Sequence, residues 1–507
     1  MKHKNHVKTS VLFLTMLSLF TVSCASPLSP GNGSSGNETA QEESAPAESS
    51  GTRRNLLNEN TPSSPLVQEY GSFAEAHEAF ATTLAREEND DDPIPAPPEG
   101  FFDLVYYPSQ VGDLAAYVSS DPGDGQKHPL IIWVVGGWGN GIDDFPWGYP
   151  EWDNDQTGSA FWQAGLLTMY PSFRGGNGNP GHYETLYGEV DDIISAYEYA
   201  ASLPYVDPQR IYLGGHSTGA TRALLASEHT DKFRSVFCFG AVDEIKYHNN
   251  SQFTFDTDKD EEYVMRSPVY WLDNIKSPTF LIEGSEGNSE NLRRMEQASQ
   301  NDKIHCYVID GADHFSVLAP LTRLAAEKIL ADTGAEPNIS ITQEELDSAM
   351  AQEPVVPMPL MTTRTLDDLG VTFSCPYLWE INTTSDASQL AVYSRYEGDN
   401  AWDMAALYIG SFTPEGNDYL QSLGEYLTQE GYETSELEIA GQPAVSALGA
   451  IFSDEGEHFY QHYIALVHGS AGIDFTFVVH ESYQQEAEAL FQAIVDSISF
   501  GESDTPQ

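Results

Sequence analysis

Short apolar runs alternate with longer amphipathic stretches between residues 102 and 331. The run Leu130–Val135 is almost continuously apolar, as expected of a strand that is covered on both faces. By contrast, Glu189–Leu203 carries its apolar residues at helical spacing. The other strand-like runs are Leu104–Tyr107, Leu114–Val118, Leu166–Tyr170, Ile211–Leu213, Val236–Phe239, Thr279–Ile282 and Ile304–Ile309. Because strands separated by helices pair in parallel, the pattern predicts an α/β domain with a mostly parallel, eight-stranded sheet.

The pattern changes beyond residue 335. Thr342 and Glu345 form a capping-box pattern that predicts a short helix, and Pro354, Pro357 and Pro359 after it predict a linker. The strand-like runs after it are Val371–Phe373, Gln389–Arg395, Ala405–Gly410, Val445–Phe452, His462–His468 and Phe475–Val479. Helical stretches accompany these runs, at Asn417–Glu430 and Gln485–Ser497, so an antiparallel α+β module is predicted. A further helix, Ser72–Arg86, is predicted ahead of the first strand.

The first residues have the pattern of an export signal. Three lysines within the first eight residues precede an apolar run, residues 11–22, that is too short to span a bilayer. The run ends at Cys24 in a sequence that resembles a bacterial lipobox, although Thr21 stands where that motif usually has leucine. The resemblance implies that Cys24 is lipidated and that the protein is exported and lipid-anchored to the cell envelope. An ordinary cleaved signal peptide is the alternative.

Length and charge narrow the possible partners. A chain of 507 residues is too long for one hydrophobic core, so more than one domain is expected. The 23 lysines and arginines face 77 aspartates and glutamates, which gives a formal net charge of -54. Such a surface repels phosphate backbones and anionic lipid headgroups, so we expect no nucleic-acid partner and membrane contact through the lipid anchor alone.

One motif places a serine where nucleophilic chemistry is expected. Gly215–Gly219 reads G-x-S-x-G, with Ser217 at its centre. It follows the strand Ile211–Leu213 and precedes a helix-compatible stretch, Ala220–Glu228. A nucleophilic serine needs this strand–turn–helix setting, because the turn is strained and a side chain at either glycine would clash. Ser217 is therefore predicted to be the nucleophile of an α/β-hydrolase fold.

This fold needs a histidine base after its last strand and a carboxylate that orients it. His314 follows the run Ile304–Ile309 and is predicted to accept the serine proton. Glu286 is the preferred acid, because its loop follows the seventh strand. Asp243, after the sixth strand, is the alternative, and Glu283, at the end of the seventh strand, is the third choice.

Backbone N–H groups next to the serine complete the predicted site. Thr218 follows the nucleophile, and Gly137 and Trp138 follow the third strand, so their N–H groups are the predicted oxyanion hole. The sequence has no H-E-x-x-H motif and no cluster of histidine and aspartate along the chain. No metal site and no cofactor are therefore expected.

Four segments resemble the catalytic domain of the prolyl oligopeptidase family and its dienelactone-hydrolase-like relatives. They are Ser172–Gly175, Tyr187–Asp192, Tyr205–Tyr212 and Gly215–Gly219. The resemblance covers about residues 102–331 and implies cleavage of peptides or esters through a serine, histidine and acid triad. Two features depart from the family: there is no room for its N-terminal β-propeller, and the loop after the seventh strand holds no aspartate.

The C-terminal module resembles the PsbP-like α/β/α sandwich of secreted bacterial lipoproteins, which implies a binding or accessory role. The segments that carry this resemblance are Gly370–Pro376, Trp379, Gly441–Ala444 and Ile494–Phe500. The predicted organisation is a signal peptide (1–23), the lipidated cysteine with a disordered linker (24–68), the α/β-hydrolase domain with its helical extension (69–335), a linker (336–364) and the PsbP-like domain (365–500).

Two functions follow from these patterns. The first is a serine hydrolase that cleaves a small ester or peptide substrate through an acyl-enzyme on Ser217. The second is a catalytically inactive hydrolase-like lipoprotein that serves as a binding scaffold. The missing aspartate favours the scaffold, and Ser217 with His314 favours the enzyme.

Overall fold

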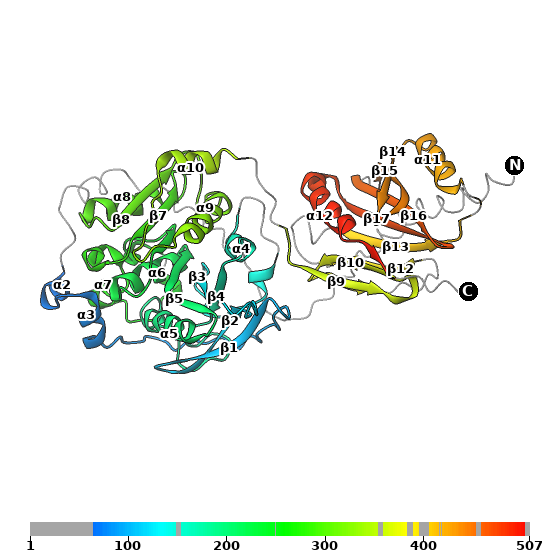
Figure 1. Cartoon of the computed structure of the whole chain (residues 1–507). Coiled ribbons are helices and arrows are strands. Elements are labelled where there is room, and N and C mark those ends of the chain that lie inside the picture. The colour runs from blue at the N-terminus through cyan, green and yellow to red at the C-terminus, as the bar shows by residue number, and fades with distance from the viewer. Residues whose placement is uncertain are drawn as a thin grey trace. The chain divides into compact units, whose positions relative to one another are not determined.

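The computed structural model describes residues 64–148, 154–248, 250–352, 358–382, 389–394, 405–414, 416, 418–452 and 458–501 (Figure 1). The chain divides into two compact units with a boundary between Pro357 and Met358. The expected signal peptide, Cys24 and most of the expected linker 24–68 lie outside the described residues. Within those residues, no helix is both long and apolar enough to cross a bilayer.

The first unit is built on one sheet of eight strands in the order β1-β2-β4-β3-β5-β6-β7-β8. The strands are β1 (Phe102–Ser109), β2 (Gly112–Ser119), β3 (His128–Val134), β4 (Leu167–Pro171), β5 (Val206–His216), β6 (Val236–Phe239), β7 (Thr279–Gly284) and β8 (Ile304–Ile309). The β1–β2 and β2–β4 pairs are antiparallel and all other pairs are parallel. The predicted mostly parallel sheet of the α/β-hydrolase fold is thus confirmed.

Helices cover both faces of this sheet (Figure 1). They are α4 (Ser159–Gln163), α5 (Gly188–Ser202), α6 (Thr218–His229), α7 (Asp260–Val264), α8 (Ser289–Ala298), α9 (Leu318–Ala331) and α10 (Gln343–Met350). Single 3₁₀ turns lie between them at Phe145–Trp147, Ile245–Tyr247, Asn250–Gln252, Pro268–Tyr270 and Leu272–Asn274. Along β5, Ile211 and Leu213 pack in one core with Val190 of α5 and Ala220 of α6. Tyr212, between them, donates its hydroxyl to Asp332 just beyond α9, on the other face.

The segment ahead of the sheet forms two short helices, α2 (Pro65–Glu69) and α3 (Phe73–Ala79). The predicted helix Ser72–Arg86 is therefore too long. Ser72 caps α3 as expected, but the chain is extended at Phe80. Beyond it, the Glu262 carboxylate accepts hydrogen bonds from the Thr82 hydroxyl and the Thr83 N–H. These tertiary bonds outweigh local helix propensity, which is a weak preference in β-branched residues.

A buried ion pair holds this extended segment. Arg266 and Glu262 are both fully buried, and their side chains meet at 2.6 Å. The other Arg266 donors reach the carbonyl oxygens of Glu184 and Thr185 and the hydroxyl of Thr82. The guanidinium also lies 4.3 Å from the centre of the Phe255 ring. Every donor of the cation thus has a partner, which a buried charge requires.

The second unit contains two antiparallel sheets. The larger has the order β11-β12-β13-β17-β16-β15-β14, and the smaller has the order β18-β10-β9. The strands are β9 (Met361–Leu366), β10 (Val371–Pro376), β11 (Glu380–Asn382), β12 (Gln389–Ser394), β13 (Ala406–Phe412), β14 (Glu433–Ile439), β15 (Gln442–Phe452), β16 (His458–His468), β17 (Ala471–His480) and β18 (Ser499–Phe500). Its helices are α11 (Tyr419–Gln429) and α12 (Gln484–Asp496), with 3₁₀ turns at Asp367–Leu369 and Glu481–Tyr483. The region is α+β and rich in sheet.

The expected linker 336–364 contains more structure than predicted. The capping box of Thr342 and Glu345 starts α10, which belongs to the first unit. Strand β9 begins at Met361 and pairs with β10 in the second unit. The capping-box pattern thus predicts α10, whereas no apolar run marks β9.

Arg266→Met should destabilise the first unit by about 3–5 kcal/mol, because it leaves the buried Glu262 carboxylate without its cation. Denaturant unfolding followed by tryptophan fluorescence measures this change. As a control, Lys246→Met breaks the exposed Lys246–Asp260 pair, which should cost less than about 1 kcal/mol. Equal effects of the two substitutions would show that the buried pair does not hold the segment.

Candidate active site

Ser217 lies on a strained turn between β5 and α6. Its backbone has φ 54° and ψ -120°, a conformation that non-glycine residues rarely adopt. A Cβ at Gly215 would lie 2.7 Å from backbone atoms of Gly219, and one at Gly219 would lie 2.2 Å from the Val134 carbonyl oxygen. Only glycine fits at both positions. The turn therefore has the geometry that presents a serine side chain at the end of a strand.

His314 lies on the loop after β8, and its ring contacts a carboxylate. The Nδ1 atom lies 2.9 Å from Oε2 of Glu283, which is itself fully buried at the end of β7. A neutral imidazole that donates Nδ1–H to this carboxylate carries its lone pair on Nε2. That Nε2 atom is buried and has no hydrogen-bond partner among the described residues. It is thus free to accept a proton.

Among the three candidate carboxylates, only Glu283 contacts the His314 ring. The preferred Glu286 is exposed, and its backbone N–H bonds to the Ala312 carbonyl. Asp243 binds Arg294 through both oxygens, so it supports that cation instead of the histidine. Glu283, the third choice, is the carboxylate that meets the ring.

The reason lies in the pairing of the strands. His216 pairs with Phe239, and Phe239 pairs with Ile282, so Ser217 and Glu283 each stand one residue beyond the same row. Glu286 lies further along the chain, beyond the end of β7. A carboxylate at the same position along the sheet as Ser217 therefore comes from β7 and not from the loop that follows it.

Two glycines make room for this pair. A Cβ at Gly240 would lie 2.3 Å from Cε1 of His314 and 2.9 Å from Oε2 of Glu283. A Cβ at Gly287 would lie 2.5 Å from Oε1 of Glu283. The second carboxylate oxygen accepts the N–H of Gly284 at 2.7 Å. Packing and hydrogen bonding thus fix the carboxylate in one orientation.

A second histidine packs against the first. The rings of His216 and His314 lie 4.5 Å apart, and Nε2 of His216 lies 3.2 Å from the His314 carbonyl oxygen. Because a carbonyl oxygen only accepts, Nε2 of His216 carries the proton. Burial lowers the pKa of His216 to about 3, and the neighbouring His314 adds to this effect. His216 is therefore a neutral ring that packs against His314. It does not take up a proton in place of His314.

The loop after β3 passes over the serine. A Cβ at Gly136 would lie 3.4 Å from the Cβ of Ser217, and Gly137 has a positive φ of 88°. The Thr218 hydroxyl donates to the Gly137 carbonyl, which holds the loop against the start of α6. Thr218 is the first residue of α6, so its N–H has no intrahelical acceptor. The N–H groups of Thr218 and this loop are thus close to the serine. The Trp138 side chain packs against Phe253.

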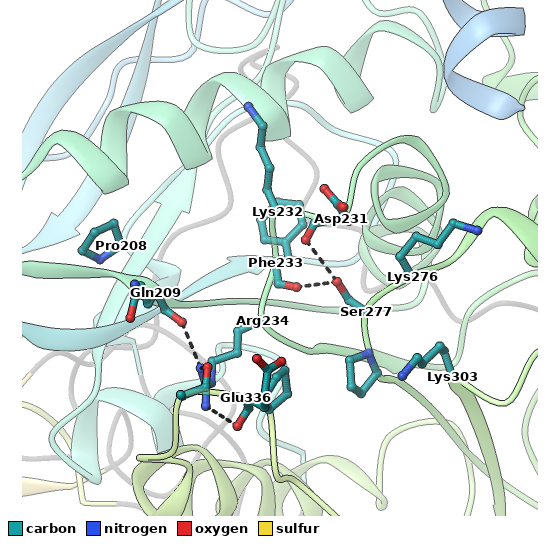
Figure 2. Close-up of a pocket in the computed structure, with 13 residues that line it drawn as sticks. Pro208, Gln209, Asp231, Lys232, Phe233, Arg234, Lys276, Ser277, Lys303 and Glu336 are labelled. Atoms are coloured by element: carbon teal, nitrogen blue, oxygen red, sulfur yellow. Dashed lines mark hydrogen bonds between the residues drawn. The ribbon is translucent and has the colours of Figure 1, made fainter.

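A cavity of about 610 Å³ lies at the opposite edge of the sheet (Figure 2). Among its lining residues, Gln209 lies near the start of β5, and Arg234, Pro278 and Lys303 lie just before β6, β7 and β8. Ser217, Glu283 and His314 lie at or beyond the ends of β5, β7 and β8. In parallel strands these are opposite edges, so this cavity is separate from the serine site.

His216 should stay neutral between pH 5 and 8, because its folded pKa is about 3. Below about pH 6.5 the unfolded chain binds a proton at His216, whereas the folded chain stays neutral there down to about pH 3. The free energy of unfolding therefore falls as the pH drops from about 6.5 toward 3. Imidazole ¹⁵N chemical shifts measure the charge of the ring directly. A titration midpoint near 6.5 for His216 would contradict this assignment.

Solved structures of peptidases and esterases are similar to part of this chain. A puromycin-hydrolyzing peptidase of Mycobacterium tuberculosis has 20% identity and a TM-score of 0.38, over 46% of this chain and 39% of that one. For an acylaminoacyl peptidase of Pyrococcus horikoshii the values are 19% and 0.39, over 48% and 44%. For an esterase of Pyrococcus furiosus they are 15% and 0.36, over 48% and 96%. The chain thus spans less than half the length of the two peptidases.

No curated protein matches the sequence. A family model does match, over the part of the chain that runs from just before α4 to the start of α8. This part includes Ser217 and Glu283, whereas His314 lies beyond it. Residues 152–289 match the model of the Prolyl oligopeptidase family.

Proposed function

We propose that this protein is a serine hydrolase that forms an acyl-enzyme on Ser217, with His314 as the base and Glu283 as the acid. One observation carries the proposal: the buried Glu283–His314 contact of 2.9 Å lies at the same sheet edge as the strained Ser217 turn. The family match over residues 152–289 also favours this chemistry.

The proposed reaction begins with attack of the Ser217 hydroxyl oxygen on the carbonyl carbon of the substrate. His314 accepts the hydroxyl proton at Nε2, and Glu283 stabilises the resulting imidazolium through Nδ1–H. The negative oxygen of the tetrahedral intermediate binds the N–H groups of Thr218 and Gly137. His314 then protonates the leaving alcohol or amine, and the acyl group remains on Ser217. Water, deprotonated by the same ring, releases the acid.

The proposed substrate is a small molecule or peptide with an ester or peptide bond, and no metal or cofactor enters these steps. The scaffold function is the alternative. Its support was the missing aspartate in the loop after β7. Because Glu283 meets His314 from the end of the strand, the absence of that aspartate no longer argues against catalysis. We therefore favour the enzyme over the scaffold.

The remaining parts of the chain have proposed roles at the membrane. Cys24 would carry the lipid that tethers the exported protein to the cell envelope, since a surface with a net charge of -54 has little attraction for anionic headgroups. We propose that the second unit is PsbP-like and acts as a binding or accessory module.

Glu283→Gln should reduce kcat by about 10⁴, because the imidazole loses the carboxylate that sets its tautomer and stabilises its cation. Hydrolysis of p-nitrophenyl esters and of proline and alanine arylamides measures the rate and identifies the bond that is cleaved. Glu286→Gln is the matched control, since Glu286 lies three residues away and is exposed. Its activity should stay close to that of the wild type.

Ser217 is tested in parallel with a fluorophosphonate probe. The wild type should be labelled and Ser217→Ala should not, with unchanged circular dichroism. Absence of labelling in the folded wild type would favour the scaffold. A larger loss in Glu286→Gln than in Glu283→Gln would transfer the role of the acid to the loop.

Cys24→Ala should release the exported protein as soluble material, because a lipid chain is the proposed tether. Partition between detergent and aqueous phases measures this. The wild type should enter the detergent phase and the variant the aqueous phase. Recovery of both in the aqueous phase would leave only a cleaved signal peptide.

A further inference from the structure

Two histidines and one aspartate meet at the junction of three helices, away from the serine. They are His77 of α3, Asp191 of α5 and His229, the last residue of α6. One ligand atom from each lies within 4.8 Å of the other two. We propose that these residues form a binding site for a divalent transition metal ion of the zinc type, which joins the N-terminal segment to the hydrolase-like unit.

The donor set selects the class of metal. Two imidazole nitrogens and one carboxylate oxygen suit zinc and its neighbours in the first transition row. Calcium and magnesium prefer sites built from oxygen atoms alone. Three protein ligands leave a fourth tetrahedral position for water.

The distances are close to those that a metal ion requires. Nδ1 of His77 lies 3.7 Å from Oδ1 of Asp191. In a tetrahedral site with bonds of about 2.0–2.1 Å, neighbouring ligand atoms lie about 3.3 Å apart. The His77–Asp191 pair therefore needs only a small movement. His229 has to approach further, by a change that a partly exposed side chain at a helix end can make.

A hydrogen bond to a backbone carbonyl orients the His77 ring, as such bonds orient histidines that bind metal ions. Its Nε2 atom lies 3.2 Å from the Tyr187 carbonyl oxygen, and the Tyr187 ring stacks on it at 4.2 Å. The Tyr187 hydroxyl in turn donates to the His77 carbonyl. Because Nε2–H donates to a backbone carbonyl, the lone pair lies on Nδ1 and faces Asp191.

This orientation leaves an unsatisfied pair of acceptors. When His77 is neutral, its Nδ1 lone pair and Oδ1 of Asp191 face each other at 3.7 Å with no proton between them, while Oδ2 of Asp191 lies 3.9 Å from Nη2 of Arg174. Nδ1 of His229 is also buried and has no hydrogen-bond partner among the described residues. A bound cation satisfies all of these groups at once. The competing arrangement is a second proton on His77, which forms an ion pair with Asp191.

The site is independent of the proposed hydrolase chemistry. Ser217 precedes the first residue of α6 and His229 is its last, so the length of that helix, about 18 Å, separates them. The metal would therefore stabilise structure and take no part in the reaction. By linking α3 to α5 and α6, it would hold the segment that leads toward the N-terminus.

Metal binding to the full-length protein, freed of metal with a chelator, tests the proposal. Cobalt(II) should give the visible absorption of a four-coordinate complex, and zinc should displace it at one equivalent. His229→Gln and Asp191→Asn should each weaken zinc binding at least about 100-fold, measured by competition with a chromophoric chelator, since even outer partners of metal ligands contribute 10- to 100-fold. Calcium should not compete.

His128→Gln is the matched control, because His128 also contacts an aspartate, Asp124, at 3.1 Å but belongs to no three-residue cluster. It should bind zinc like the wild type. Thermal unfolding without metal checks that each variant folds. Zinc should raise the Tm of the wild type and of His128→Gln but not that of His229→Gln. Zinc affinity that is equal in the wild type, His229→Gln and Asp191→Asn would overturn the proposal.

Discussion

The hydrogen-bonded register of four parallel strands decides where each group of the candidate active site lies. β5, β6, β7 and β8 pair residue by residue, so their carboxyl ends form one edge. Ser217, Gly240 and Glu283 each stand one position beyond the row that contains His216, Phe239 and Ile282. The loop after β8 brings His314 over this edge. A shift of one residue in any pair would move the serine, the glycine that makes room or the carboxylate out of line.

Several of the few cationic side chains of this protein are buried inside the first unit. Four arginines are buried, at Arg174, Arg222, Arg234 and Arg266. Arg174 binds Asp192 and Glu184, and Arg234 binds Asp332 through both carboxylate oxygens. The Arg234–Asp332 pair connects segments far apart in sequence, as Arg266 does for the segment ahead of β1. Arg174, Arg234 and Arg266 thus neutralise buried carboxylates, whereas the buried Glu228 carboxyl group has no hydrogen-bond partner among the described residues.

Sequence patterns predict the elements that periodicity describes well and miss those that depend on a partner. The strands of the first sheet follow from apolar runs, most clearly β3, β4, β6 and β7, whose residues are almost all buried. β14 has the sequence ETSELEI and is an edge strand that pairs only with β15, so no apolar run marks it. The helix at Ser72 ends early because Glu262, almost 200 residues later, binds its continuation. The same holds for the cluster of His77, Asp191 and His229, which only the packing of three helices assembles. The places of Ser217 after β5 and His314 after β8 follow from motif and chain order, whereas the contact between His314 and Glu283 depends on the register.

Glu283 lies on a strand and not on the loop that follows. A sequence comparison that looks for an aspartate in that loop alone would therefore overlook the carboxylate that contacts His314 in this chain. A comparison that also inspects the last residues of β7 would find Glu283, which stands level with Gly240 after β6. In a chain with this arrangement, the acidic partner of the histidine follows from the pairing of the strands and not from the sequence of the loop.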